Sequence, residues 1–223
     1  MPRRVRWWRA LQRNPTYSQK VKDIDVENGI SRPIASEIAH SGVSSGLRGA
    51  GIVLAGSGLV AVCSHVSLPL WFTPVPLTLQ PFAVLLLGLV LAPRLAAATL
   101  LAYLAEGAIG LPVFAPGFTF SSGLAHLFGP TGGYLLAYPV AAMLISSLYR
   151  RTHRNFPAAF ISAGIGNLVI LLCGALWLSV LTQVSASAAV KLAILPFLPG
   201  DALKVAAAAA LAAGFQRLRR QNA

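Results

Sequence analysis

The feature that most constrains the fold of this chain is a series of six long stretches that are almost free of charge. They occupy residues 49–66, 77–92, 95–111, 132–149, 158–181 and 192–215. Most have the roughly 17–25 residues that a helix needs to cross the hydrocarbon core of a bilayer. The second stretch is short, and Pro196, Pro199 and Gly200 interrupt the sixth. Because a water-soluble chain of 223 residues has no use for six such segments, we predict an all-α, polytopic membrane protein with six transmembrane helices.

The distribution of Lys and Arg predicts how these spans are oriented. Nine of the 18 basic residues precede the first stretch, one lies between the second and third, three between the fourth and fifth, and three follow the sixth. The connections 67–76 and 112–131 carry none, and the remaining connection carries only Lys191. Basic residues accumulate in the cytoplasmic loops of membrane proteins. We therefore expect both termini on the cytoplasmic side of the cell (inner) membrane.

This topology also accounts for the net charge of +12. Because topology explains the charge, no nucleic-acid partner is expected, and we expect the basic segments to contact anionic lipid headgroups. Residues 1–45 form a basic, aromatic extension without the apolar core of a signal peptide. A disordered tail and an amphipathic surface helix both remain open for it. We expect the membrane domain over residues 46–217, followed by a basic cytoplasmic tail over residues 218–223.

Two opposite charges stand out at the start of the sixth stretch. The segment "LPFLPGDALK" places Asp201 and Lys204 three residues apart, and residues 205–215 carry no charge. At this spacing both side chains share one face of a helix. A charge within the hydrocarbon costs about 2.5–3.5 kcal/mol on insertion scales, so ionisable residues there usually face each other or a cavity. Two interpretations remain open: a self-neutralising pair with Asp201 capping the helix, and a pair that faces a ligand pocket.

Three further polar residues of the predicted spans are within reach of the same outer half. Gln80 enters the second span from outside, Asn167 lies in the middle of the fifth, and Glu106 lies near the external end of the third. Each is a candidate ligand-binding residue of the same outer site. The alternatives are that Glu106 pairs with Lys204, and that the amides bond to neighbouring helices at roughly 0.6–1.7 kcal/mol each.

The two long external connections are unusually apolar for exposed loops. The segments "SLPLWFTPVPLTLQ" and "PVFAPGFTFSSGLAHLFGPTGGY" are rich in aromatic residues, Pro and Gly and contain no Lys or Arg. We expect them to fold down as lids over a ligand with an apolar body, and "GPTGGY" to turn the chain into the fourth span. The chain has no Walker A sequence, metal-binding His-Glu-x-x-His helix or Gly-x-Ser-x-Gly elbow. We therefore expect a binding or transport subunit rather than an enzyme, with no cofactor and no metal.

Several segments together resemble the BioY family, the biotin-binding S components of energy-coupling factor (ECF) transporters. They are "PVPLTLQ" (74–80), "GAIGLPVFA" (107–115), "GLAHLFGPTGGYLLAYP" (123–139) and "LPFLPGDALK" (195–204). The likeness covers about residues 46–217 in the same order. It implies a six-helix S-component fold with biotin held near the outer face, beneath the first external loop. It also implies high-affinity uptake with a transmembrane scaffold subunit and two ATPase subunits.

The resemblance turns the polar residues into a candidate biotin site. The biotin-binding candidates are Asp201, Lys204, Gln80, Asn167, Glu106 and Tyr134. The carboxylate of Asp201 can accept from a ureido N–H, and Lys204 can donate to a carbonyl or carboxylate. The resemblance also implies that small residues of the first span admit the scaffold subunit. These docking candidates are Gly51, Ala55, Ser57 and Ala61.

Two other functions remain open at this point. The chain is alternatively an S component for another small vitamin, which the co-purifying ligand would reveal. It is alternatively a membrane assembly protein without a ligand, which would tolerate apolar replacements of both Asp201 and Lys204.

Overall fold

The fold is that of a computed structural model, which describes residues 34–116 and 123–221. The chain divides into two units, Met1–Leu47 and Arg48–Ala223, and the helical bundle, its loops and its pocket belong to the second. The predicted extension lies outside the described residues as far as residue 33. Helix α3, Ile34–His65, begins ahead of residue 46, where the sequence places the start of the membrane domain.

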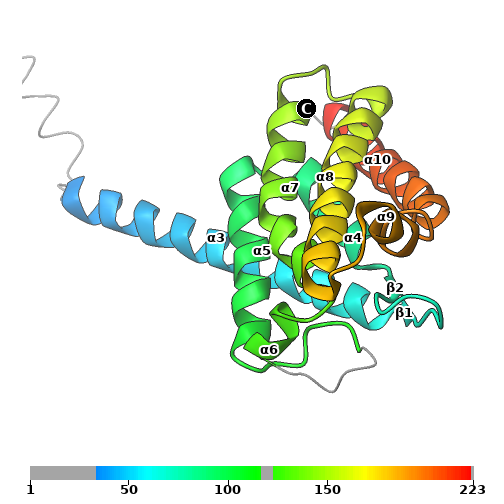
Figure 1. Cartoon of the computed structure of the whole chain (residues 1–223). Helices are drawn as coiled ribbons and strands as arrows, with labels where there is room; N and C mark the ends of the chain where they lie inside the picture. Colours follow the sequence, from blue (N-terminus) through cyan, green and yellow to red (C-terminus); the bar gives the residue numbers. More distant parts are fainter. Residues whose placement is uncertain (1–33, 117–122, 222–223) are drawn as a thin grey trace, which may run out of the picture. The chain divides into compact units, whose positions relative to one another are not determined.

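The described part of the chain is mostly helical (Figure 1). After α3 come α4 Gln80–Val90, α5 Pro93–Ala108, α6 Leu124–Leu127, α7 Gly132–Arg150, α8 Phe156–Thr182, α9 Ala186–Ala193 and α10 Leu198–Gln221. The first external loop departs from the all-α expectation, because strands β1 Ser67–Leu68 and β2 Leu77–Thr78 pair antiparallel. Its ends are drawn together where the Leu79 amide donates to the Val66 carbonyl at 2.9 Å.

Four helices of the described chain are long and apolar enough to cross a membrane. The segments are Gly46–His65, Gly132–Arg150, Phe156–Thr182 and Leu198–Arg219. Helix α4 is apolar but has only 11 residues, and α5 has 16 residues that include Arg94 and Glu106. The structure is thus that of a multi-pass membrane protein with four helices of spanning length, where the sequence predicts six.

Local sequence signals explain where the helices begin. Proline occupies the first turn of α4, α5 and α8. The N–H groups of a first turn have no partner within the helix, so the missing N–H of proline costs no helical hydrogen bond there. The side chain of Asn155 accepts from the Ala158 amide at the start of α8, and Ser185 accepts from Ala188 at the start of α9. Helix α7 starts at Gly132, so "GPTGGY" is the turn that the sequence predicts.

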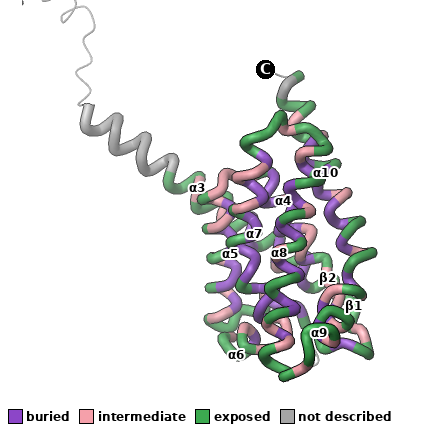
Figure 2. The backbone as a smooth tube through the Cα atoms, turned by 45° about the horizontal axis from the view of Figure 1, so that its top comes forward, coloured by how far each residue is buried: buried purple, intermediate pink, exposed green. Residues whose placement is uncertain are grey.

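Helix α7 lies at the centre of the bundle and packs against α4, α5 and α8, while α10 packs against α4 and α8. Figure 2 shows the buried residues on the faces that these helices turn toward one another. Small residues permit the close approach. A Cβ atom at Gly166 would lie 2.3 Å from the side chain of Ile145 on α7. The outer face of α8 exposes Leu168, Leu172 and Leu176, as expected of a surface that faces lipid tails.

The three connections that the sequence predicts to be external gather at one end of the bundle. The β1–β2 hairpin, α6 and α9 lie together there, at the end opposite the C-terminus (Figures 1 and 2). A hydrogen bond ties two of them, since the Thr73 hydroxyl in the hairpin donates to the Leu192 carbonyl in α9 at 2.9 Å. The loops therefore cover this end of the bundle, as their apolar sequences predict.

Candidate ligand-binding site

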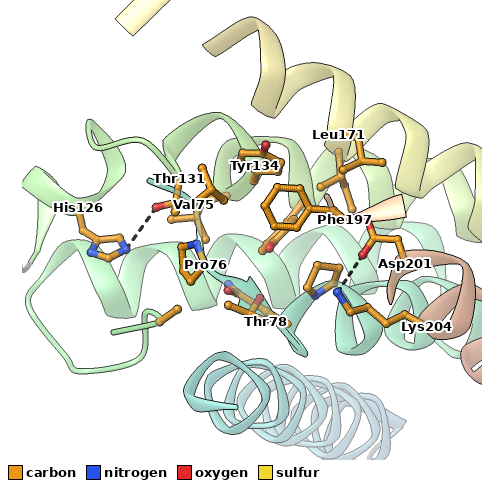
Figure 3. A pocket seen from close by; sticks show the side chains of 16 residues that line it. Val75, Pro76, Thr78, His126, Thr131, Tyr134, Leu171, Phe197, Asp201 and Lys204 are labelled. Carbon is orange, nitrogen blue, oxygen red and sulfur yellow. Dashed lines mark hydrogen bonds and ion pairs between the residues drawn. The ribbon is translucent and has the colours of Figure 1, made fainter. Parts of the chain in front are cut away.

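A pocket lies between this loop layer and the helices beneath it (Figure 3). Its closed centre has a volume of about 40 Å³, and the space between atoms across the whole depression is about 530 Å³. The hairpin contributes Val75, Pro76 and Thr78, while the second external loop contributes Ala115, His126 and Thr131. The helices contribute Gln80, Pro81, Tyr134, Leu135, Tyr138, Ile170, Leu171, Asp201 and Lys204, and Phe197 precedes α10. The pocket is thus mostly apolar, with an acid, a base and an amide in its wall.

The acid and base at the start of α10 form a buried ion pair. Lys204 Nζ lies 2.8 Å from Asp201 Oδ1, and the two side chains are 10% and 5% exposed. Asn167 on α8 donates from Nδ2 to the other carboxylate oxygen, Asp201 Oδ2, at 3.2 Å. Asp201 also lies in the first turn of α10, where the helix dipole favours a negative charge. The two residues therefore neutralise each other and also line the pocket. The predicted cap is wrong, because α10 begins three residues earlier at Leu198 and the Asp201 carboxylate accepts from Lys204 and Asn167 instead.

Asn167 has an unused acceptor. Its Oδ1 atom is buried and has no hydrogen-bond partner among the described residues. An unsatisfied buried polar atom costs about 1–3 kcal/mol. Asn167 does not itself line the pocket, but it contacts the Asp201 carboxylate that does. Asn167 therefore acts on the pocket through the Asp201 carboxylate, to which its Nδ2 donates.

Gln80 and Tyr134 are the other predicted residues that the fold brings to this pocket. Gln80 Nε2 donates to the Tyr103 hydroxyl on α5 at 2.8 Å. Tyr134 on α7 donates its hydroxyl to the Ala193 carbonyl at 2.7 Å, which joins α7 to the end of α9. Its ring also packs edge-on against Phe197, with ring centroids 6.3 Å apart. These contacts fix one aromatic wall of the pocket.

The structure does not bring Glu106 to the pocket. Its Oε1 atom accepts from the Ser57 hydroxyl on α3 at 2.8 Å, and Lys204 pairs with Asp201 instead. Glu106 and Tyr103 are three residues apart and share one face of α5, but Glu106 bonds to α3 while Tyr103 bonds to the pocket residue Gln80. Position along the helix axis predicts depth in the membrane but not which neighbour a side chain contacts.

Of the four predicted docking residues of α3, two are exposed and two are turned toward the core. Gly51 and Ala55 are exposed, Ala61 is half-buried and packs against the core, and Ser57 is fully buried. Ser57 therefore serves the contact between α3 and α5. The exposed small face of α3 is the part that contains Gly51 and Ala55.

Tyr103 is a site residue that the sequence analysis missed. It is fully buried, and its hydroxyl joins Gln80 to the second external loop. A tyrosine within an apolar span is itself a signal, since a buried tyrosine hydroxyl usually has a hydrogen-bond partner.

The sequence is similar to a known protein family and to several of its members. The BioY family model matches residues 36–221. The chain belongs to the BioY family. Biotin transporter BioY2 of Lactococcus lactis subsp. cremoris is 42% identical over 154 residues, which are 69% of this chain and 81% of that relative. The probable biotin transporter BioY of Pyrococcus horikoshii is 44% identical over 143 residues, 64% of this chain and 82% of that protein.

A solved structure shows the fold of this BioY chain. The crystal structure of the S-component for biotin from an ECF-type ABC transporter superposes with a TM-score of 0.71 at 24% sequence identity. The superposition covers 78% of this chain and 93% of the other. This BioY family member therefore has the S-component fold.

Proposed function

We propose that this chain is the biotin-binding S component of an ECF transporter, a high-affinity uptake subunit in the cytoplasmic membrane. The observation that carries the proposal is the buried pair Asp201–Lys204 in the wall of an otherwise apolar pocket. Membership of the BioY family, whose relatives above are biotin transporters, supports it. So does the S-component fold.

The pocket suits both parts of the biotin ring system. The ureido ring offers two N–H donors and a carbonyl, and Asp201, to which Asn167 donates, supplies an acceptor while Lys204 supplies a donor. The thiophane ring is apolar and fits against Tyr134 and Phe197. The pocket should therefore select a ligand whose ring system is polar at one end and apolar at the other.

Biotin enters by displacing the hairpin. A cavity of about 40 Å³ has room only for water, whereas pockets for small molecules measure about 300–1,000 Å³. Val75, Pro76 and Thr78 form the hairpin's part of the pocket wall, and Thr73 fastens the hairpin to α9. Opening this side creates space without disturbing the packed helices below.

The proposed topology has six membrane segments with both termini in the cytoplasm. Helices α4 and α5 are the second and third segments, and their packing against α7 within the bundle supports this assignment. Cysteines introduced at Arg151 and Ser187, both exposed, test it in intact cells. A membrane-impermeant reagent should label position 187 and not position 151, and the opposite pattern contradicts the topology.

Transport against a gradient needs partner subunits. The sequence carries no Walker A motif, so energy comes from two ATPase subunits through a transmembrane scaffold subunit. The exposed small residues Gly51 and Ala55 of α3 provide a surface for the scaffold. The basic cytoplasmic segments contact anionic lipid.

Equilibrium binding tests the function directly. The purified chain in lipid nanodiscs should bind labelled biotin at one saturable site, and unlabelled biotin should displace it whereas thiamine and riboflavin should not. Displacement by another vitamin would point to an S component of different specificity. Absence of any vitamin binding by the folded chain would favour an assembly protein without a ligand.

A further inference from the structure

We propose that Tyr103 is a positioning residue that turns the Gln80 amide so that its oxygen serves the pocket as a hydrogen-bond acceptor. The inference rests on the proposed function, since the donor it selects is a ureido N–H of biotin. Tyr103 itself does not line the pocket. Its effect on the ligand therefore passes through Gln80.

The hydrogen bonds of Tyr103 to Val113 and Gln80 favour one orientation for the amide. The Tyr103 hydroxyl lies 2.9 Å from the Val113 carbonyl and 2.8 Å from the Gln80 side chain. A carbonyl only accepts, so the single hydroxyl hydrogen is directed to Val113. The hydroxyl oxygen then faces Gln80 as an acceptor, and only the amide nitrogen can donate to it. The oxygen and nitrogen of an amide are otherwise hard to tell apart, so this network assigns them.

The amide oxygen is consequently left for the pocket. Gln80 is only 3% exposed and lines the pocket. Its Nε2 atom donates to Tyr103, and this is the one side-chain hydrogen bond of Gln80 found within the described ranges 34–116 and 123–221. With Asp201, the pocket then offers acceptors on two helices, α4 and α10. A ring with two N–H donors, such as the ureido ring, matches such a pair of acceptors.

The surroundings of Tyr103 hold its ring in place. Phe114 packs edge-on against the ring at 5.5 Å, and it stacks on the pocket residue His126 at 5.0 Å. Gly107 makes this arrangement possible, because a Cβ atom there would lie 2.0 Å from the Phe114 ring. Tyr103 therefore joins Gln80 to the second external loop as one rigid unit.

The first test removes only the hydroxyl. Tyr103→Phe should weaken biotin binding about ten-fold, because the amide is free to turn and present its nitrogen to the ligand. Tyr149→Phe is the matched control, since Tyr149 is also a fully buried tyrosine but lies in a separate core cluster. It should leave biotin affinity unchanged. In a Gln80→Met background, Tyr103→Phe should have no further effect on affinity. A full ten-fold loss in that background overturns the positioning role.

The second test uses two cyclic carbamate analogues of biotin, in each of which a ring oxygen replaces one ureido N–H. The isomer that lacks the N–H facing Gln80 should bind the unaltered chain about ten-fold more weakly than biotin binds that chain. In the Gln80→Met variant, the same isomer and biotin should bind with equal affinity. Equal penalties in both proteins for both isomers overturn the inference. This comparison needs no change at Tyr103, so it stands even if Tyr103→Phe does not fold. Absence of biotin binding by the unaltered chain instead overturns the proposed function, and the inference with it.

Discussion

At the scale of single residues, the pair Asp201–Lys204 shows how a charge is kept in an apolar helix bundle. Each charge loses its hydration on burial, and the 2.8 Å contact between them compensates. Removing one partner of a buried pair typically costs about 3–5 kcal/mol, because the other is left uncompensated. A single substitution at either position therefore perturbs folding as well as binding, and the two effects need separate measurement.

The wall residue Tyr134 depends on a glycine of α8 against which its ring packs. A Cβ atom at Gly174 of α8 would lie 2.3 Å from the Tyr134 ring. Gly174→Ala should displace the ring and break the hydroxyl's bond to Ala193, which typically contributes about 0.5–1.5 kcal/mol. We expect roughly ten-fold weaker biotin binding by calorimetry. The control is Gly164→Ala on the same helix, where nothing lies within 4 Å. Equal affinities for the two variants would contradict this role of Gly174.

Sequence reasoning at this scale succeeds where spacing determines the contact. The i, i+3 spacing places Asp201 and Lys204 on one helix face, and the structure confirms their pairing. The rotation of α5 could not be predicted in the same way. Glu106 turns to Ser57 and Tyr103 to Gln80 because of how α5 packs in the bundle, which a single apolar stretch does not encode.

At the scale of elements, the first external loop is a short hairpin with one side-chain bond to α9. The Thr73 hydroxyl donates to the Leu192 carbonyl, and Thr73 is buried. Strands of two residues have little stability of their own, so this bond and apolar contacts hold the loop over the pocket.

Thr73→Val keeps the shape of the side chain and removes that bond. Biotin should dissociate about two- to ten-fold faster, since a hydrogen bond contributes about 0.5–1.5 kcal/mol and the hairpin opens more readily. Stopped-flow or radioligand release measures the rate. Thr182→Val serves as the control, because the Thr182 hydroxyl donates within its own helix to Leu178. An unchanged release rate in Thr73→Val would show that the hairpin is not held by this bond.

The apolar sequence of the loops predicts that they fold inward, and the hairpin and second loop do line the pocket. The strands themselves were not predicted, because two-residue ladders are too short to leave an alternating pattern. The first turns of the helices were more predictable, since Pro, Asn155 and Ser185 act locally.

At the scale of the whole molecule, one face of α3 around Gly51 and Ala55 is not covered by the described residues. Gly51 and Ala55 are exposed on it, whereas Ser57 and Ala61 are turned toward the core. Six hydrophobic stretches predicted the helical bundle, and the second is short as helix α4 is, but they did not indicate that α5 also falls short of spanning length.

Ala55→Leu should obstruct a scaffold helix without disturbing the pocket. We expect loss of energised biotin uptake in cells, with biotin affinity of the purified chain within about two-fold of the unaltered protein. Ala210→Leu, at an exposed alanine of α10, should retain both activities. Loss of binding in step with uptake would show that Ala55 packs within the chain instead.

The central claim is that the acid–base pair serves a ligand as well as the helix, and the double variant Asp201→Asn with Lys204→Met tests it most directly. Removing both charges leaves neither one stranded, so thermal unfolding should be close to that of the unaltered chain. A charge-assisted hydrogen bond contributes about 1.5–3 kcal/mol, so biotin affinity should fall roughly 10- to 150-fold. A double variant that folds well and binds biotin with unaltered affinity would contradict the account.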